Sequence, residues 1–251
     1  MLRLELPADP PEETQLELPF TVDRTSAEGA YRGWLRGLGW FRPSDLGPAS
    51  RLETMTPLWW VGWVFDAEAT VTWAADSDAD ARRSEWAPHS GQTELRFDDV
   101  VVSASRGLAA RETEWLIPTY DLETAQDAAR EPEPGTSVER FDLPRSAARG
   151  RVGAFIEQLV SERLEREAIP GTRFRNVHAA VALRRLVTRR VAFPSYVLAY
   201  RYRGSVYRVV ISGQDATCVI GTAPTSTAKI LAVVIGGLAA LALLVALIAA
   251  L

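Results

Sequence analysis

The feature that most constrains this chain is an apolar run at its C-terminal end. Ile230 to Leu251 is a run of 22 residues without a charged or strongly polar side chain. As a helix the run would be about 33 Å long, enough to cross a hydrocarbon core of about 30 Å. A buried helix of this length in a globular protein normally has a polar face, and this run has none. The sequence therefore predicts one transmembrane helix over 230–251, preceded by a short tether over 222–229.

Small residues recur at every fourth position within this run, at Ala232, Gly236 and Ala240. On a helix they would share one face, where small side chains allow two backbones to approach closely. The spacing predicts a helix-association face and, with it, a homo-oligomer. The alternative is that an alanine-rich segment produces this spacing by chance.

The N-terminal residues favour a cytoplasmic location for most of the chain. The opening MLRLELPADPPEETQ is acidic and proline-rich, and it lacks the apolar centre of a signal peptide. Lys229, the only lysine, directly precedes the apolar run, in agreement with the positive-inside tendency. We therefore expect a single-pass, tail-anchored protein of the cell inner membrane, with its bulk cytoplasmic and with membrane lipid as a partner.

The formal net charge of −4 is distributed very unevenly along the chain. Residues 1–145 carry 27 acidic residues and 14 arginines, whereas residues 146–214 carry 4 acidic residues and 13 arginines. The arginine-rich block must contact something negative: the acidic half of the chain, anionic lipid or nucleic acid. Its position before the apolar run favours lipid headgroups over nucleic acid, and pairing with the acidic half is equally favoured. The candidate contacts with anionic lipid or a protein partner are Arg184, Arg185, Arg189, Arg190, Arg201 and Arg203.

Hydrophobic patterning predicts an α+β fold made of two helix-plus-antiparallel-sheet units. A flexible acidic lead-in over 1–19 precedes a first unit over 20–122, a linker over 123–145 and a second unit over 146–221. Helical spacing of apolar residues predicts one helix capped by Thr25 or Ser26. It predicts another over 146–168, with an apolar face formed by Val152, Phe155, Ile156 and Leu159. Aromatic and β-branched residues predict strands over 56–73 and 94–103, and three strands over 174–211.

The two units share a short sequence similarity. The segment beginning at Pro57 resembles the segment beginning at Pro194, with Trp59 aligned to Tyr196 and Trp63 aligned to Tyr200. A duplication of one helix-plus-sheet unit would explain the match. Convergent strand composition would produce the same pattern.

Residues that carry chemistry are few and scattered. One cysteine and two histidines exclude a disulfide framework and a histidine-rich metal site. The Asp76-Ser-Asp78-Ala-Asp80 spacing opens like a calcium loop, but it lacks the glycine and glutamate expected at the sixth and twelfth positions. No phosphate-binding, dinucleotide-binding or serine-nucleophile motif occurs. We therefore expect no catalytic residues, no cofactor and no metal. An enzyme with a cleft lined by His89, Asp98 and Asp99 is the alternative.

Four stretches of the chain resemble a bacterial family. They are WVFDA from Trp63, FDDVVVSASR from Phe97, WLIPTYDL from Trp115 and PSYVLAYRYRG from Pro194. The segment 18–215 resembles the region that follows the ribbon in TFIIB-type zinc-ribbon-containing membrane-associated proteins. CxxC pairs precede that region in the family and are absent here, so the ribbon's metal and nucleic-acid associations are not carried over. Some members of that family occur together with phage-shock-type and flotillin-like membrane proteins. The resemblance therefore implies a role in membrane stress or membrane-scaffold assembly.

These expectations together describe a non-enzymatic adaptor. A tail-anchored α+β module would engage a membrane-associated protein partner at the cytoplasmic face. The alternative is a nucleic-acid-binding module that uses the arginine-rich region 168–214, and nucleic acid is the less favoured partner.

Overall fold

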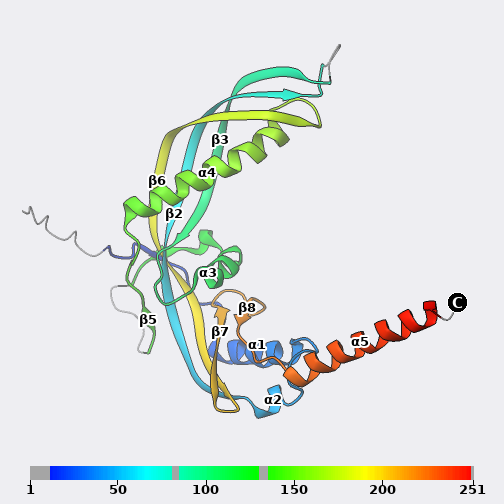
Figure 1. Cartoon of the computed structure of the whole chain (residues 1–251). Helices are drawn as coiled ribbons and strands as arrows, with labels where there is room; N and C mark the ends of the chain where they lie inside the picture. The colour runs from blue at the N-terminus through cyan, green and yellow to red at the C-terminus, as the bar shows by residue number, and fades with distance from the viewer. Residues whose placement is uncertain (1–11, 81–84, 130–134, 250–251) are drawn as a thin grey trace, which may run out of the picture. The chain divides into compact units, whose positions relative to one another are not determined.

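The computed structural model describes residues 12–80, 85–129 and 135–249, and Figure 1 shows their helices and strands. Its strands form one mixed, eight-stranded sheet with the order β3-β2-β6-β1-β4, to which β5 is joined through β2 and β8 through β7. The β1–β6 pair is parallel, and the β2–β3, β6–β7, β7–β8 and β1–β4 pairs are antiparallel. The strands are β1 (Leu16–Glu17), β2 (Arg51–Ser77), β3 (Ala87–Ser103), β4 (Gln126–Asp127), β5 (Ser137–Val138), β6 (Phe174–Tyr202), β7 (Ser205–Ser212) and β8 (Val219–Gly221).

The helices lie between these strands and after them in the chain. They are α1 (Arg24–Gly37), α2 (Leu46–Ala49), α3 (Ala110–Leu116), α4 (Arg145–Glu167) and α5 (Thr227–Ala249), with the 3-10 turns η1 (Ile117–Thr119) and η2 (Leu122–Thr124). The predictions of the first and second helices and of strands over 56–73 and 94–103 are confirmed by α1, α4, β2 and β3. The cap of α1 is Asp23, two or three residues earlier than the predicted Thr25 or Ser26, because the Asp23 carboxylate accepts a hydrogen bond from the N–H of Ser26 at 2.7 Å.

The chain divides into two compact units. Unit 1 comprises Trp59–Pro194 and the described residues up to Pro19, and unit 2 comprises Phe20–Leu58 and Ser195–Leu251. The strands β2 and β6 each continue from one unit into the other, so neither unit is a consecutive helix-plus-sheet segment of the chain. The predicted architecture of two successive sheet units is therefore wrong, because every strand belongs to one hydrogen-bonded sheet.

Unit 1 is held together by helix α4 and by an aromatic cluster on the sheet. Four residues of α4 that recur every fourth position are fully buried, namely Val152, Ile156, Val160 and Leu164. In the cluster, the Trp60 ring stacks on Phe193 with ring centres 4.4 Å apart. The Tyr120 hydroxyl accepts a hydrogen bond from the Trp60 indole and donates one to the Pro194 carbonyl. These contacts fix the two longest strands of unit 1 side by side.

Unit 2 packs helix α1 onto the β6–β7 hairpin. Tyr31 and Leu35 of α1 lie in one buried cluster with Leu198 and Tyr200 of β6 and Ile211 of β7. The region 174–211 was predicted to contain three strands, but it contains two. Strand β6 continues through Pro194 and the arginine-rich segment as one element of 29 residues.

The C-terminal helix α5 requires the largest correction. Among the residues that the structure describes, no helix is both long enough and apolar enough to cross a membrane. This finding overturns the predicted transmembrane helix over 230–251, and with it the single-pass tail anchor and the inner-membrane location. Residues 250 and 251 lie outside the described residues.

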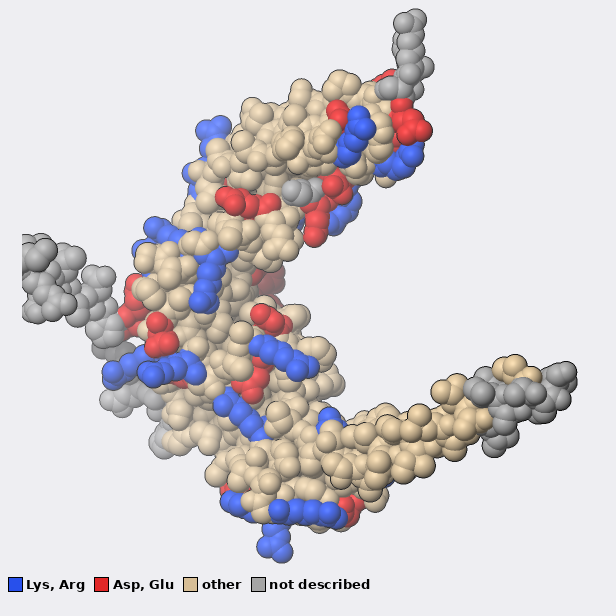
Figure 2. Space-filling view, viewed as in Figure 1, with Lys and Arg blue, Asp and Glu red and all other residues tan. Residues whose placement is uncertain are grey.

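The predicted helix-association face lies on the exposed surface of α5. Ala232, Gly236 and Ala240 are all exposed, and nothing among the described residues lies within 4 Å of a Cβ built at Gly236. Lys229, in the first turn of α5, is the last charged residue of the chain, and Figure 2 shows the rest of the described helix in tan. No contact in the structure tests self-association, which stays a prediction.

Candidate functional site: a groove along the edge of the sheet

The arginines of β6 contact the acidic half of the chain. In unit 1, arginines earlier in β6 pair with residues later in β2, which shows that the two strands run antiparallel. The contacts between the strands are Arg189–Asp66 at 3.0 Å, Arg185–Glu68 at 3.7 Å and Arg175–Asp76 at 3.2 Å, and Arg184 donates to the Thr70 hydroxyl at 2.9 Å. Just beyond the ends of the two strands, Arg173 pairs with Asp78 at 3.4 Å. Arg190 pairs with Glu12 at 2.6 Å, and in unit 2 Arg201 pairs with Glu53 and Arg203 with Asp45 at 2.8 Å.

Of the negative partners that the charge distribution allowed, the acidic half of the chain is the one that these arginines contact within the structure. Each of the six arginines predicted to contact lipid or a partner binds a side chain of the acidic half. Figure 2 accordingly shows basic and acidic side chains next to each other in several places on the visible face. Contacts of these arginines with lipid or with a protein partner remain untested predictions.

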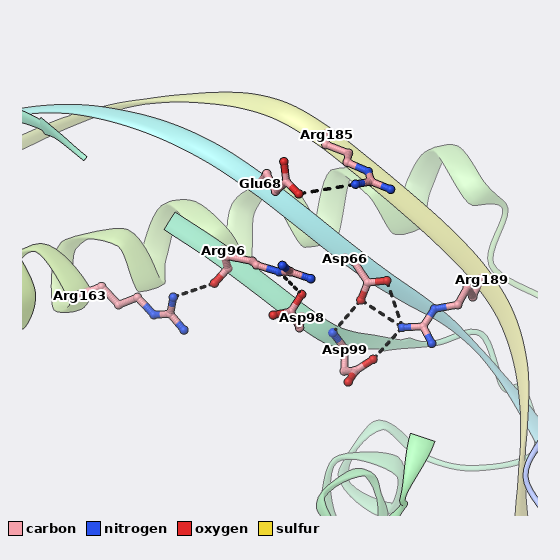
Figure 3. Close-up of polar contacts among 8 residues, drawn as sticks. All are labelled: Asp66, Glu68, Arg96, Asp98, Asp99, Arg163, Arg185 and Arg189. Carbon is pink, nitrogen blue, oxygen red and sulfur yellow. Dashed lines mark hydrogen bonds and ion pairs between the residues drawn. The ribbon is translucent and has the colours of Figure 1, made fainter. Parts of the chain in front are cut away.

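The densest of these contacts surrounds a bulge between β2 and β3 (Figure 3). The register shifts between Phe65 and Ala67, and Asp99 opposite has a positive φ of 58°. Its N–H donates to the Asp66 carboxylate at 3.0 Å, and one Arg189 nitrogen donates to both Asp66 oxygens and to Asp99 at 2.7 Å. Asp tolerates this left-handed conformation better than most residues, and a bulge turns the strand locally. The cluster therefore locks the bulge in place.

The neighbouring Asp98 is held separately. It accepts a hydrogen bond from Arg96 at 2.7 Å, so the two adjacent carboxylates bind different arginines. His89 lies elsewhere on β3, where its ring nitrogen is 3.3 Å from the Ala79 carbonyl oxygen. The structure does not bring His89, Asp98 and Asp99 together as the alternative enzyme reading required. Asp76 pairs with Arg175 of β6 and Asp78 pairs with Arg173, the residue before β6, and the described residues include no group of three ligands suited to a metal ion.

A groove of about 540 Å³ begins beside this cluster. It is lined by seven consecutive residues of β3, Phe97–Ser103, together with residues of α3, η1 and α4. Successive side chains of a strand point to opposite faces, so seven consecutive residues line one groove only where it follows the edge of the strand. Figure 1 shows α3 and α4 beside β3 within unit 1. The groove therefore runs along an edge of the sheet and has helical walls.

The walls of the groove are largely apolar and have charges at their margins. Phe155 of α4 is 45% exposed although it is a large aromatic residue, and it lines the groove beside the fully buried Val152. Arg163 lies over the Phe97 ring, 4.8 Å from its centre, and donates to the Arg96 carbonyl at 2.8 Å. An exposed aromatic side chain inside a concave apolar surface is typical of a binding site.

The sequence did not identify this groove. In the sequence, the stretch from Phe97 to Ser103 carries part of the family resemblance and the paired carboxylates Asp98 and Asp99. Phe155 was predicted to lie on the apolar face of a helix, but the structure leaves it exposed at the groove. The signal present in the sequence is the pair Asp98-Asp99 directly before three valines. Charged residues protect the exposed edge of a strand against pairing with another strand, and the three valines that follow have no such charge.

Comparisons with known proteins place the chain near one uncharacterised protein. No family model matches it, and no solved structure matches it significantly. The chain is 22% identical over 230 residues to a protein of Bacillus subtilis (strain 168) described as "Uncharacterized protein YdjG". The match covers 86% of this chain and 65% of that protein's length. The resemblance to zinc-ribbon-containing proteins is not tested by these comparisons.

Proposed function

We propose that this chain is a non-enzymatic interaction module that binds an extended polypeptide segment in the groove along β3. The observation that carries this proposal is the exposure of Phe155 inside a groove that follows a strand edge. The groove volume of about 540 Å³ lies within the range of about 300–1,000 Å³ that is typical of ligand-binding pockets. Its apolar lining favours burial of apolar side chains of a partner.

The charges around the groove support binding rather than catalysis. Asp98 and Asp99 are the acidic side chains of β3 at the groove, and each is bound to its own arginine. Neither contacts a histidine, cysteine or serine nucleophile among the described residues. The proposed module has the adaptor role expected from the sequence, but α5 does not serve as its membrane anchor.

The nucleic-acid alternative finds less support. Binding of a phosphate backbone needs arginines that are free to neutralise the phosphates and displace the counterions condensed on the nucleic acid. Arg184, Arg185, Arg189 and Arg190 already contact Thr70, Glu68, Asp66 and Glu12, so a phosphate would have to displace these partners.

A selection of binding peptides tests the proposed function. A phage-displayed library of random dodecapeptides is panned on the full chain, on Phe155→Arg and on Leu183→Arg. Leu183 is also 45% exposed but lies on β6 outside the groove, which makes it the matched control. We expect the same peptides to be enriched on the wild type and on Leu183→Arg and lost on Phe155→Arg. Equal enrichment on all three proteins would show that the groove is not the binding site.

A further inference from the structure

The outer edge of β3 has backbone groups that no other described strand uses. β3 is the terminal strand of the sheet order, so among the strands that the structure describes it pairs only with β2, along one edge. The N–H of Ala104 donates to the Val61 carbonyl on β2 at 2.9 Å. In an antiparallel pair the residues alternate between bonding toward the partner strand and pointing away from it. Val102 and Val100 therefore bond toward β2, and Val101 and Ser103 point their N–H and C=O groups into the groove.

Only the first part of this edge carries the features that prevent strand pairing. Proteins protect exposed edges with bulges, charges and covering side chains. The bulge at Asp99, the charge of Asp98 and the Arg163 guanidinium on the Arg96 carbonyl protect the edge up to Asp99. Val100 to Ser103 have none of these features among the described residues, and they lie in the groove itself. The unprotected edge thus coincides with the concave apolar surface.

The charge of the α4 wall indicates what an added segment carries. The α4 residues that line the groove include two arginines, Arg151 and Arg163, and no acidic residue. Arg163 is engaged by Phe97 and by the Arg96 carbonyl, whereas Arg151 forms no ion pair within the described part of the chain. Opposite, Glu114 of α3 lines the other wall. An acidic side chain on a bound segment would therefore be attracted to the α4 wall and repelled from the α3 wall.

We propose that the partner is an extended, apolar polypeptide segment with an acidic side chain, which adds to the sheet as a strand beside Val100–Ser103 and places its acid next to Arg151. The inference rests on the proposed function and specifies its binding mode. In such strand addition, main-chain hydrogen bonds supply affinity while alternate side chains supply specificity. The backbone groups of Val101 and Ser103 form the hydrogen bonds, and Phe155 covers the alternate apolar side chains of the segment.

The test uses peptides from the dodecapeptide selection, so that the protein itself stays unchanged in the first step. Each peptide is synthesised with one backbone N–H methylated at a time, and its affinity for the full chain is measured by fluorescence anisotropy. We expect methylation at alternate central positions to weaken binding about tenfold and methylation at the positions between them to have little effect, because only alternate N–H groups face the edge. Tolerance of methylation at every position would overturn strand addition.

Charge variants test the acidic requirement. Arg151→Gln should weaken binding of the acidic peptide several-fold and leave its glutamine-substituted version unaffected, whereas Glu114→Gln should not weaken either. Equal effects of Arg151→Gln on both peptides would overturn the proposed role of the acid. A selection that yields no Phe155-dependent peptide would instead overturn the proposed function, so the two failures have different signatures.

Discussion

Arg189 on β6 binds Asp66 on β2 through a single guanidinium nitrogen, which lies 3.0 Å and 3.1 Å from the two carboxylate oxygens. The same nitrogen lies 2.7 Å from the Asp99 carboxylate, so one cation joins three strands of the sheet at the bulge. Its side chain is 28% exposed, less than that of the other arginines paired with β2. The arginine-rich block is therefore part of the fold, and Arg189 positions the protected end of the groove.

Replacement of Arg189 should destabilise the protein more than replacement of a neighbouring arginine on the same strand. Arg189→Met leaves two partly sheltered carboxylates side by side, and we expect a loss of about 1–2 kcal/mol in unfolding free energy. Arg185→Met removes a 3.7 Å contact whose arginine is 66% exposed, and its effect should stay within about 0.5 kcal/mol. Urea denaturation of both variants measures the difference. Equal losses would contradict the role given to Arg189.

Acid should weaken unit 1 through Asp78. Hydrogen bonds from the N–H groups of Thr172 and Arg173 and from the Thr172 hydroxyl hold the pKa of Asp78 well below its ordinary value. Because the folded pKa is lower than the unfolded one, the stabilisation is complete above the unfolded pKa of about 3.9 and is lost as the pH falls toward the folded value.

The variant Asp78→Asn should therefore be less stable than the wild type at neutral pH, and the gap should close below about pH 4. Urea midpoints measured across this range give the comparison. Asp127→Asn serves as the control because Asp127 is exposed and has no side-chain hydrogen bond among the described contacts. Its midpoint should follow that of the wild type at every pH. A gap for Asp78→Asn that persists unchanged into acid would contradict the assignment.

Two buried tyrosines of unit 2 should respond oppositely to loss of their hydroxyl. The Tyr31 hydroxyl is buried and has no hydrogen-bond partner among the described residues, and burial raises the pKa of Tyr31 to about 12. The Tyr200 hydroxyl donates to the Thr222 carbonyl at 2.9 Å. Tyr31→Phe removes an unsatisfied group and should leave stability unchanged or raise it by up to about 1 kcal/mol, whereas Tyr200→Phe should cost about 1 kcal/mol. A loss on Tyr31→Phe, seen by urea denaturation, would show that its hydroxyl has a partner in solution.

Local patterns in the sequence predicted local elements well. Helix α4 follows from the spacing of Val152 and Ile156, and the strand over 94–103 follows from its valines. The continuity of β6 was missed because Pro194 and repeated arginines resemble strand boundaries. In the folded protein those arginines extend toward carboxylates on β2 instead of interrupting the strand.

The candidate site depends on contacts that are distant in sequence. Arg189 and Asp66 are separated by 123 positions, and the groove unites β3 with helices that follow it in the chain. Composition showed that the arginines needed a negative partner, but only the register of β2 against β6 selects the acidic half. Likewise, periodicity placed Phe155 on a helix face, and only the packing of α4 leaves it exposed at the strand edge.

The affinity of one selected dodecapeptide for three proteins tests the central claim most directly. Fluorescence anisotropy is measured with the wild type, Phe155→Arg and Leu183→Arg, after circular dichroism has confirmed that all three are folded. If the groove along β3 binds the segment, Phe155→Arg lowers affinity by at least about tenfold while Leu183→Arg stays at the wild-type value. Equal affinity for Phe155→Arg and the wild type would contradict the assignment of the groove as the binding site.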